Sequence, residues 1–216
     1  MSERYVSVRV RGEFALFTRP ENKVERVSYP VMTPSAARGI LEAIFWKPEF
    51  TWAIREIHVL PAPPDSVDQR PVRTLGILRN EVNSKMSPAR SDPYFADDDR
   101  AQRHSICLRD VDYVILAEAN VKPGVVENHA KFRDQFRRRI ERGQCYHRPA
   151  LGCREFAAEF GPADGAPTPV DWTEDLGLML WDLDYRSKPP YWPRFFPART
   201  DAGVMTVPNR PLEAPQ

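Results

Sequence analysis

Cysteine is scarce in this 216-residue chain, and long apolar runs are absent. The three cysteines, Cys107, Cys145 and Cys153, are odd in number and form no CxxC pair, which argues against a disulfide framework and a zinc site. No stretch approaches the roughly 18 apolar residues of a membrane-spanning helix, and the N-terminus lacks the apolar block of a signal peptide. We therefore expect a cytoplasmic protein without membrane association, metal or other cofactor.

The chain also lacks an excess of charge of either sign. It has 31 Lys and Arg against 30 Asp and Glu, a formal net charge of +1, so the total does not indicate nucleic-acid binding. The positive charge is instead concentrated, because residues 131–148 hold seven Lys or Arg and only two acidic residues. The GxSxG, P-loop and HExxH motifs are absent. Any nucleic-acid site must come from the local cluster.

Hydrophobic periodicity predicts an α+β fold. Thr33 and Pro34 have the residue types of a helix N-cap and first turn, and Gly143 is a typical helix end. The order is then β-α-β, an insertion, and β-α-β, which is the ferredoxin-like arrangement. The predicted strands are 5–11, 50–60, 111–119 and 153–160, and the predicted helices are 33–44 and 128–142.

Two units follow from these assignments. Residues 1–160 form the ferredoxin-like domain, with an irregular insertion at about 61–108 that includes a hairpin near 72–86. Residues 161–216 form a C-terminal β-rich extension, with a strand at 176–185 and a tail that packs across a sheet.

The helix at 128–142 is the first candidate for a binding surface. Closely spaced cationic groups make charge-assisted hydrogen bonds to phosphates and release counterions. The alternative is a solvated helix face, the usual role of a charge run. The cationic side chains, which surround an apolar stripe, are Lys131, Arg133, Arg137, Arg138, Arg139 and Arg142.

The segment after this helix is the second candidate. Two glycines bracket an aromatic ring, a histidine and arginines, so the loop can bring amides close to phosphate while the ring stacks on a base. The alternative is an ordinary connection in which the ring and the histidine are partly buried packing residues. The candidate contacts are Tyr146, His147, Arg148 and Arg154.

Eight segments match one known family in order over roughly residues 5–185. They are 17–20, 23–29, 32–44, 46–48, 79–82, 108–115, 136–139 and 143–156. Together they resemble the CRISPR-associated protein 5 family of subtype I-C, and the last 30 residues match weakly.

The resemblance implies a ferredoxin-like, RNA-recognition-motif-like domain with a C-terminal β-rich extension. It implies binding to the repeat-derived 5′ handle of crRNA, beside the backbone and large subunits of a Cascade complex. In this subtype it also implies metal-independent cleavage of precursor crRNA. The positive surface is expected to continue through Lys23, Arg26 and Lys47.

Metal-free RNA cleavage uses the 2′-hydroxyl as nucleophile and needs a base, a cation and an acid. The resemblance places these on a Tyr or His before Trp-Lys-Pro and on a Lys-His pair in the second helix. This chain has Phe45 at the first position and Lys131-Phe132 at the pair. His129 or His147 would have to replace the missing groups. His129 lies about 200° from Lys131 on an ideal helix, so it could act only if the helix begins after it.

Three interpretations remain open. The chain is a handle-binding subunit that processes its RNA, or the same subunit with processing weakened or lost, or a ferredoxin-like scaffold whose basic helix binds an acidic protein. Tight, salt-sensitive binding to a repeat RNA would exclude the scaffold. An activity assay separates the first two.

Overall fold

A computed structural model describes residues 4–22, 25–62, 72–80, 101–126, 128–185 and 191–212. Lys23, one of the predicted RNA contacts, lies outside the described residues. Neither described helix is long and apolar enough to cross a membrane. The strands are β1 (Val6–Ala15), β2 (Arg26–Val27), β3 (Phe50–Val59), β4 (Val72–Asn80), β5 (Ala101–Val121), β6 (Glu159–Gly161), β7 (Glu174–Asp184), β8 (Trp192–Asp201) and β9 (Val204–Thr206), and the helices are α1 (Pro34–Ile44) and α2 (His129–Glu141).

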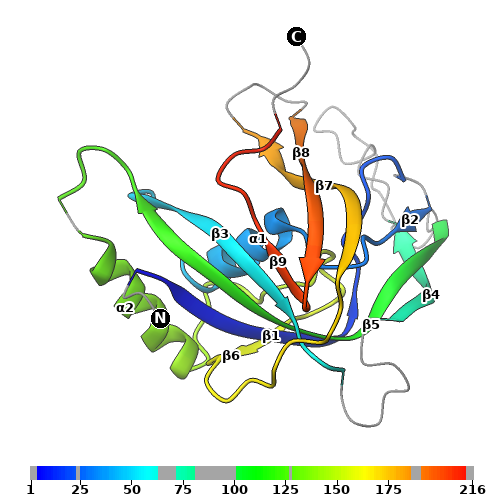
Figure 1. Cartoon of the computed structure of the whole chain (residues 1–216), viewed down its shortest axis with the longest axis horizontal. Helices are drawn as coiled ribbons and strands as arrows, with labels where there is room; N and C mark the ends of the chain where they lie inside the picture. Colours follow the sequence, from blue (N-terminus) through cyan, green and yellow to red (C-terminus); the bar gives the residue numbers. More distant parts are fainter. Residues whose placement is uncertain are drawn as a thin grey trace, which may run out of the picture.

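One curved, mostly antiparallel sheet carries both helices (Figure 1). Its strand order is β6-β1-β5-β3-β9-β8-β7, and β2 and β4 pair with further parts of β5. Only β2 runs parallel to its partner among the described strand pairs. The predicted α+β class is therefore confirmed.

Both helices begin where the sequence predicts. Thr33 caps α1, and its hydroxyl accepts a hydrogen bond from the amide of Ala36 at 3.3 Å. Asn128 caps α2, and its side chain accepts one from the amide of Lys131 at 3.2 Å. These bonds satisfy amides that the first turn of a helix leaves without partners.

An aromatic cluster holds both helices against the same face of the sheet. The ring of Phe50 on β3 lies 4.8 Å from that of Phe132 on α2 and 5.6 Å from that of Phe45, which follows α1. Trp52, two residues along β3, packs against Phe136 at 4.7 Å. Aromatic pairs at these separations add about 0.5–1.5 kcal/mol each to the burial of their surface. The cluster therefore fixes α1 and α2 relative to each other.

Strand β5 is longer than the pattern predicts. The hydrophobic pattern predicts an irregular insertion up to residue 108 and a strand from 111, whereas β5 begins at Ala101 and pairs with β4. Asp110 has a φ of +53°, which interrupts the extended backbone inside the strand. A residue in this conformation breaks the two-residue alternation from which strands are predicted. The predicted hairpin near 72–86 is therefore wrong in its second strand, which begins at 101.

The predicted strand at 153–160 is mostly a turn. Only its last two residues belong to β6, which pairs with β1. The amide of Phe156 donates to the carbonyl of Cys153 at 3.0 Å, and the carbonyl of Phe156 accepts from the amide of Leu151 at 2.7 Å. These local bonds use the backbone groups that a strand would need for a ladder.

The C-terminal residues form three strands, β7, β8 and β9. Strand β9 continues the main sheet by pairing with β3, Glu56 lying opposite Thr206. The prediction that the tail packs across a sheet is therefore wrong for this strand, which extends the sheet at its edge. Strands β8 and β7 then follow in the same sheet.

The loop between α2 and β6 is held to β1 at one close approach. The amide of Leu16 donates to the carbonyl of Leu151 at 3.0 Å. The next residue, Gly152, has a φ of +88°, and a Cβ there would lie 2.1 Å from the carbonyl oxygen of Leu16. Only glycine fits this position without moving backbone.

We predict that Gly152→Ala lowers thermal stability far more than Gly143→Ala, because only the former adds a clash with backbone. Gly143 also has a positive φ, of +61°, but a Cβ there would meet nothing within 4 Å. The control variant should therefore lose only about 1–3 kcal/mol from backbone strain. Thermal melts of the two variants test this, and equal melting temperatures would contradict it.

Candidate nucleic-acid interface

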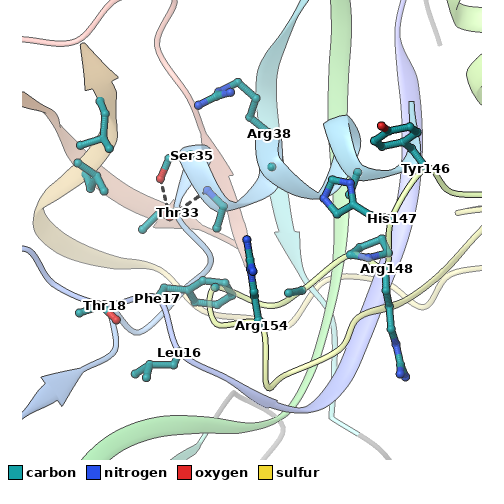
Figure 2. A pocket seen from close by; sticks show the side chains of 18 of the residues that line it. Leu16, Phe17, Thr18, Thr33, Ser35, Arg38, Tyr146, His147, Arg148 and Arg154 are labelled. Atoms are coloured by element: carbon teal, nitrogen blue, oxygen red, sulfur yellow. Dashed lines mark hydrogen bonds between the residues drawn. The ribbon is translucent and has the colours of Figure 1, made fainter. Parts of the chain in front are cut away.

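A cavity of about 940 Å³ lies between α1, the segment after β1, the loop after α2, and β7. Figure 2 shows it from close by, with the loop residues on one side and the start of α1 above. The structure brings four predicted RNA contacts together in its lining, namely Tyr146, His147, Arg148 and Arg154.

The end of α1 positions the aromatic part of this loop. The amides of Tyr146 and His147 both donate to the carbonyl of Ala43, at 2.8 and 3.3 Å. That carbonyl is among those that the last turn of a helix leaves without partners. The backbone is thus fixed while the Tyr146 side chain is 84 % exposed, and its ring lies 5.9 Å from that of His147. The alternative that Tyr146 and His147 are packing residues is wrong.

The cavity is positively charged. Among the described residues, its lining contains three arginines and a histidine and no acidic residue. Within the described part of the chain, Arg148 and Arg154 make no ion pair. Figure 2 shows Arg154 extending toward α1 between Phe17 and His147, whereas Arg148 points to the opposite side of the loop. Arg154 is therefore the arginine best placed to meet an anion inside the cavity.

The third arginine, Arg38, is already engaged. Its guanidinium donates two hydrogen bonds to Asp182 on β7, both at 2.8 Å, and one to Glu42 at 2.7 Å. Burial disfavours its charge, but these carboxylates outweigh burial and raise the pKa of Arg38 above its ordinary value. Arg38 thus joins α1 to β7 beside the cavity. Its charge is balanced by the two carboxylates, so it attracts an anionic ligand only weakly.

The basic face of α2 forms a separate surface, since none of its side chains lines the cavity. Arg137 is exposed and donates to the carbonyl of Tyr5 at 3.1 Å, and Arg133 pairs with Asp134 at 2.8 Å. Arg138 and Arg142 are exposed and lack ion-pair partners among the described residues. Charge on this helix is therefore available at its C-terminal end, where the cavity loop begins.

Arg139 links the helix to the end of α1. It donates to the carbonyl of Ile44 at 2.7 Å, and its guanidinium carbon lies 5.1 Å from the centre of the Phe45 ring. This contact satisfies a second free carbonyl of α1 and places the α2 C-terminus beside the cavity loop. Its role is therefore structural.

The two phenylalanines at the expected catalytic positions are buried. Phe45 and Phe132 are each 1 % exposed, and both touch Phe50. The helix α2 begins at His129 itself, so the condition under which His129 could act beside Lys131 is not met. Lys131 is exposed in the first turn of α2, and an ideal helix puts it about 16 Å along the axis from Arg142. Lys131 and the cavity therefore lie toward opposite ends of α2.

The remaining predicted contacts lie around the cavity. The guanidinium of Arg26 on β2 approaches the sulfur of Cys153 at 3.5 Å, which places Arg26 against the cavity loop. Lys47 is half-buried just beyond α1. Sequence reasoning missed two aromatic side chains, Trp46, which is 58 % exposed, and Tyr185, which lines the cavity from the end of β7. An isolated aromatic residue at the end of a strand gives no pattern that distinguishes it from a core residue.

The family model and the related proteins that match this chain agree on one family. A family model described as a CRISPR-associated protein, Cas5, matches residues 5–208. A CRISPR pre-crRNA endoribonuclease Cas5d of Thermus thermophilus is 47 % identical over 184 residues, which are 85 % of this chain and 75 % of that protein. A protein of the same name from Mannheimia succiniciproducens is 42 % identical over 223 residues, covering 94 % of each.

Two solved structures share the fold. The crystal structure of a CRISPR-associated protein superposes with a TM-score of 0.66 at 23 % identity, covering 95 % of this chain and 92 % of that one. A functionally uncharacterised protein from Streptococcus mutans gives a TM-score of 0.65 at 22 % identity with the same coverage. With the family match over nearly all of the sequence, these findings show that this chain belongs to the CRISPR-associated Cas5 family, in its Cas5d branch.

Proposed function

We propose that this Cas5d-family protein binds crRNA and cleaves its precursor within the repeat. The observation that carries the proposal is a cavity whose described lining has arginine, histidine and tyrosine but no acidic residue, in a chain whose relatives are named pre-crRNA endoribonucleases. An unpaired nucleotide offers a flat base to the tyrosine and an anionic phosphate to the arginines. The cavity therefore offers a partner to both parts of a nucleotide, whereas an acidic side chain would use only the arginines.

We further infer that the core is ferredoxin-like. The strand order β6-β1-β5-β3 and the chain order β1-α1-β3-β5-α2-β6 are those of a split βαβ unit. The RNA would be the repeat-derived 5′ handle, and the cytoplasmic partners would be the backbone and large subunits of a Cascade complex.

Cleavage would begin with attack of a 2′-hydroxyl on the adjacent phosphorus. The 2′-oxygen loses its proton to a base, the bond to the 5′-oxygen breaks, and that oxygen gains a proton. Lys131 would stabilise the negative charge that builds up on the phosphate. RNA that reaches both Lys131 and the cavity would have to run along α2, past Arg138 and Arg142.

A second candidate function is RNA binding with weak cleavage or none. The observation that favours it is the burial of Phe45 and Phe132, because neither ring can transfer a proton. With the lysine alone, no proton shuttle operates efficiently near neutral pH, since the ordinary pKa of lysine is about 10.4. The direct test is to incubate the pure protein with its own repeat RNA in EDTA and to follow the RNA on a gel.

We predict that reversing the charge of α2 weakens binding to the repeat RNA. In the double variant Arg137→Glu with Arg138→Glu, two phosphate contacts are lost, so the plot of log affinity against log salt should flatten by about 1.4 for a single strand. Arg199→Glu with Arg210→Glu is the control, because these exposed arginines carry the same charge change on the C-terminal segment. Filter binding across a salt series measures both, and an unchanged slope in the folded α2 variant would remove α2 from the RNA site.

We predict that Tyr146→Ala weakens RNA binding by about 1–3 kcal/mol, because stacking of one base on an aromatic side chain is of this size. The melting temperature should not change, since the ring is 84 % exposed. Tyr146→Phe keeps the ring and should bind like the unmodified protein. Normal RNA affinity in Tyr146→Ala would show that this ring does not stack on a base.

We predict slow cleavage that depends on Lys131. Lys131→Ala should abolish it, and Phe45→Tyr with Phe132→His should raise the single-turnover rate, since each general acid or base contributes about 10²–10⁴-fold. The affinity for RNA should change little.

The control is Phe136→His, which introduces a histidine one turn further along α2 at an equally buried position. It should cost stability, as Phe132→His does, without raising the rate. If the unmodified protein cuts as fast as the double variant, the two phenylalanines do not limit the chemistry.

A further inference from the structure

Three exposed aromatic rings gather where β7 ends and β8 begins. Tyr185, Tyr191 and Trp192 are 55 %, 40 % and 67 % exposed, and the rings of Tyr185 and Tyr191 lie 4.9 Å apart. Single exposed apolar residues are common on proteins, but a group of large rings in one place often marks a binding surface. Of the three, only Tyr185 lines the cavity.

The structure fixes Tyr185 from two directions. Its ring packs on Tyr191, and the guanidinium carbon of Arg38 lies 5.6 Å from the centre of the ring. Arg38 also holds Asp182, three residues earlier on β7, through two hydrogen bonds of 2.8 Å. The ring is therefore held at the cavity before any ligand arrives, which lowers the entropy cost of binding.

The cavity combines two kinds of group that recognise different parts of one ligand. Tyr146 and Tyr185 provide exposed rings from separate parts of the chain, and Arg154 provides a cation with no ion-pair partner among the described residues. The described residues of the lining include arginines and no acidic residue, so the cavity favours an anion. Its volume of about 940 Å³ falls within the usual range for small-molecule sites, about 300–1,000 Å³.

We propose that Tyr185, which directly follows β7, is a base-stacking residue of the RNA site, so that the C-terminal extension forms one wall of a pocket for an unpaired nucleotide. Tyr146 provides a second ring in this pocket, and Arg154 binds the phosphate. Arg38 is a positioning residue that holds Tyr185 and does not itself contact RNA. This inference rests on the proposed function, since it names a subsite of the same RNA interface.

The test uses a fluorescent synthetic 5′-handle RNA taken from the protein's own repeat. This RNA is the cleavage product, so processing does not interfere with its dissociation constant. Tyr185→Ala should raise the Kd by about 10-fold to 100-fold, as expected for loss of one stacked base, and Tyr185→Phe should bind normally. Trp192→Ala is the matched control, because this ring is exposed beside Tyr185 but does not line the cavity.

Abasic substitutions along the RNA identify the stacked base. At one position, removal of the base should weaken binding to the unmodified protein and have no further effect on Tyr185→Ala. A side chain that only supports the fold would give no such position. This comparison stays informative if Tyr185→Ala also lowers the melting temperature.

Each contrary outcome has a distinct meaning. Normal binding by Tyr185→Ala, or an equal loss in Trp192→Ala, would overturn the pocket while leaving the proposed function intact. Normal RNA binding by Tyr185→Ala would instead favour a contact between the Tyr185 ring and a partner protein. Failure of the unmodified protein to bind the handle RNA at all would instead overturn the proposed function.

Discussion

The pairing of β5 with four other strands is the constraint on which the rest of the structure depends. Strands β1 and β3 flank its second half, and β2 and β4 pair with its first half. Its residues Val111, Tyr113, Ile115 and Ala117 all face the buried side. A slip of one residue would turn this whole set outward and bring charged neighbours such as Asp112 into the core. With β5 fixed in this way, Phe50 and Trp52 on the adjacent β3 present a firm surface on which α1 and α2 are oriented.

The position of the cavity follows from this arrangement. RNA-recognition motifs stack bases on aromatic residues of the open sheet face. Here the sheet face opposite the helices carries the Arg9–Asp112 ion pair. The exposed Tyr146 and Arg154 line the cavity beside α1 instead, where the end of α1 anchors the loop after α2. The proposed ligand surface of this Cas5d-family protein thus lies at the cavity beside the helices.

Sequence reasoning worked where the signal is local and failed where it depends on distant segments. The cap at Thr33 and the buried stripe of α2 follow from neighbouring residues, and the structure has both. The loop residues that gather at the cavity came from composition and family resemblance together. The first half of β5 was missed because its partner β4 is separated from it by a long stretch of sequence. Tyr185 was missed because its partner Arg38 is remote in sequence. Phe45 and Phe132 are buried against Phe50, and no sequence motif links Phe50 to these two residues.

The pairing of β9 with β3 affects the order in which parts of the chain fold during synthesis. Domains fold as synthesis proceeds from the N-terminus, and β3 emerges from the ribosome about 150 residues before its neighbour β9. During that interval this edge of the sheet is open, and open edges invite pairing with other chains. Strand β7, which carries one wall of the cavity, also emerges late. A nascent chain therefore acquires its basic helix before its complete pocket, and a prematurely terminated product would keep the charge of α2 without that wall.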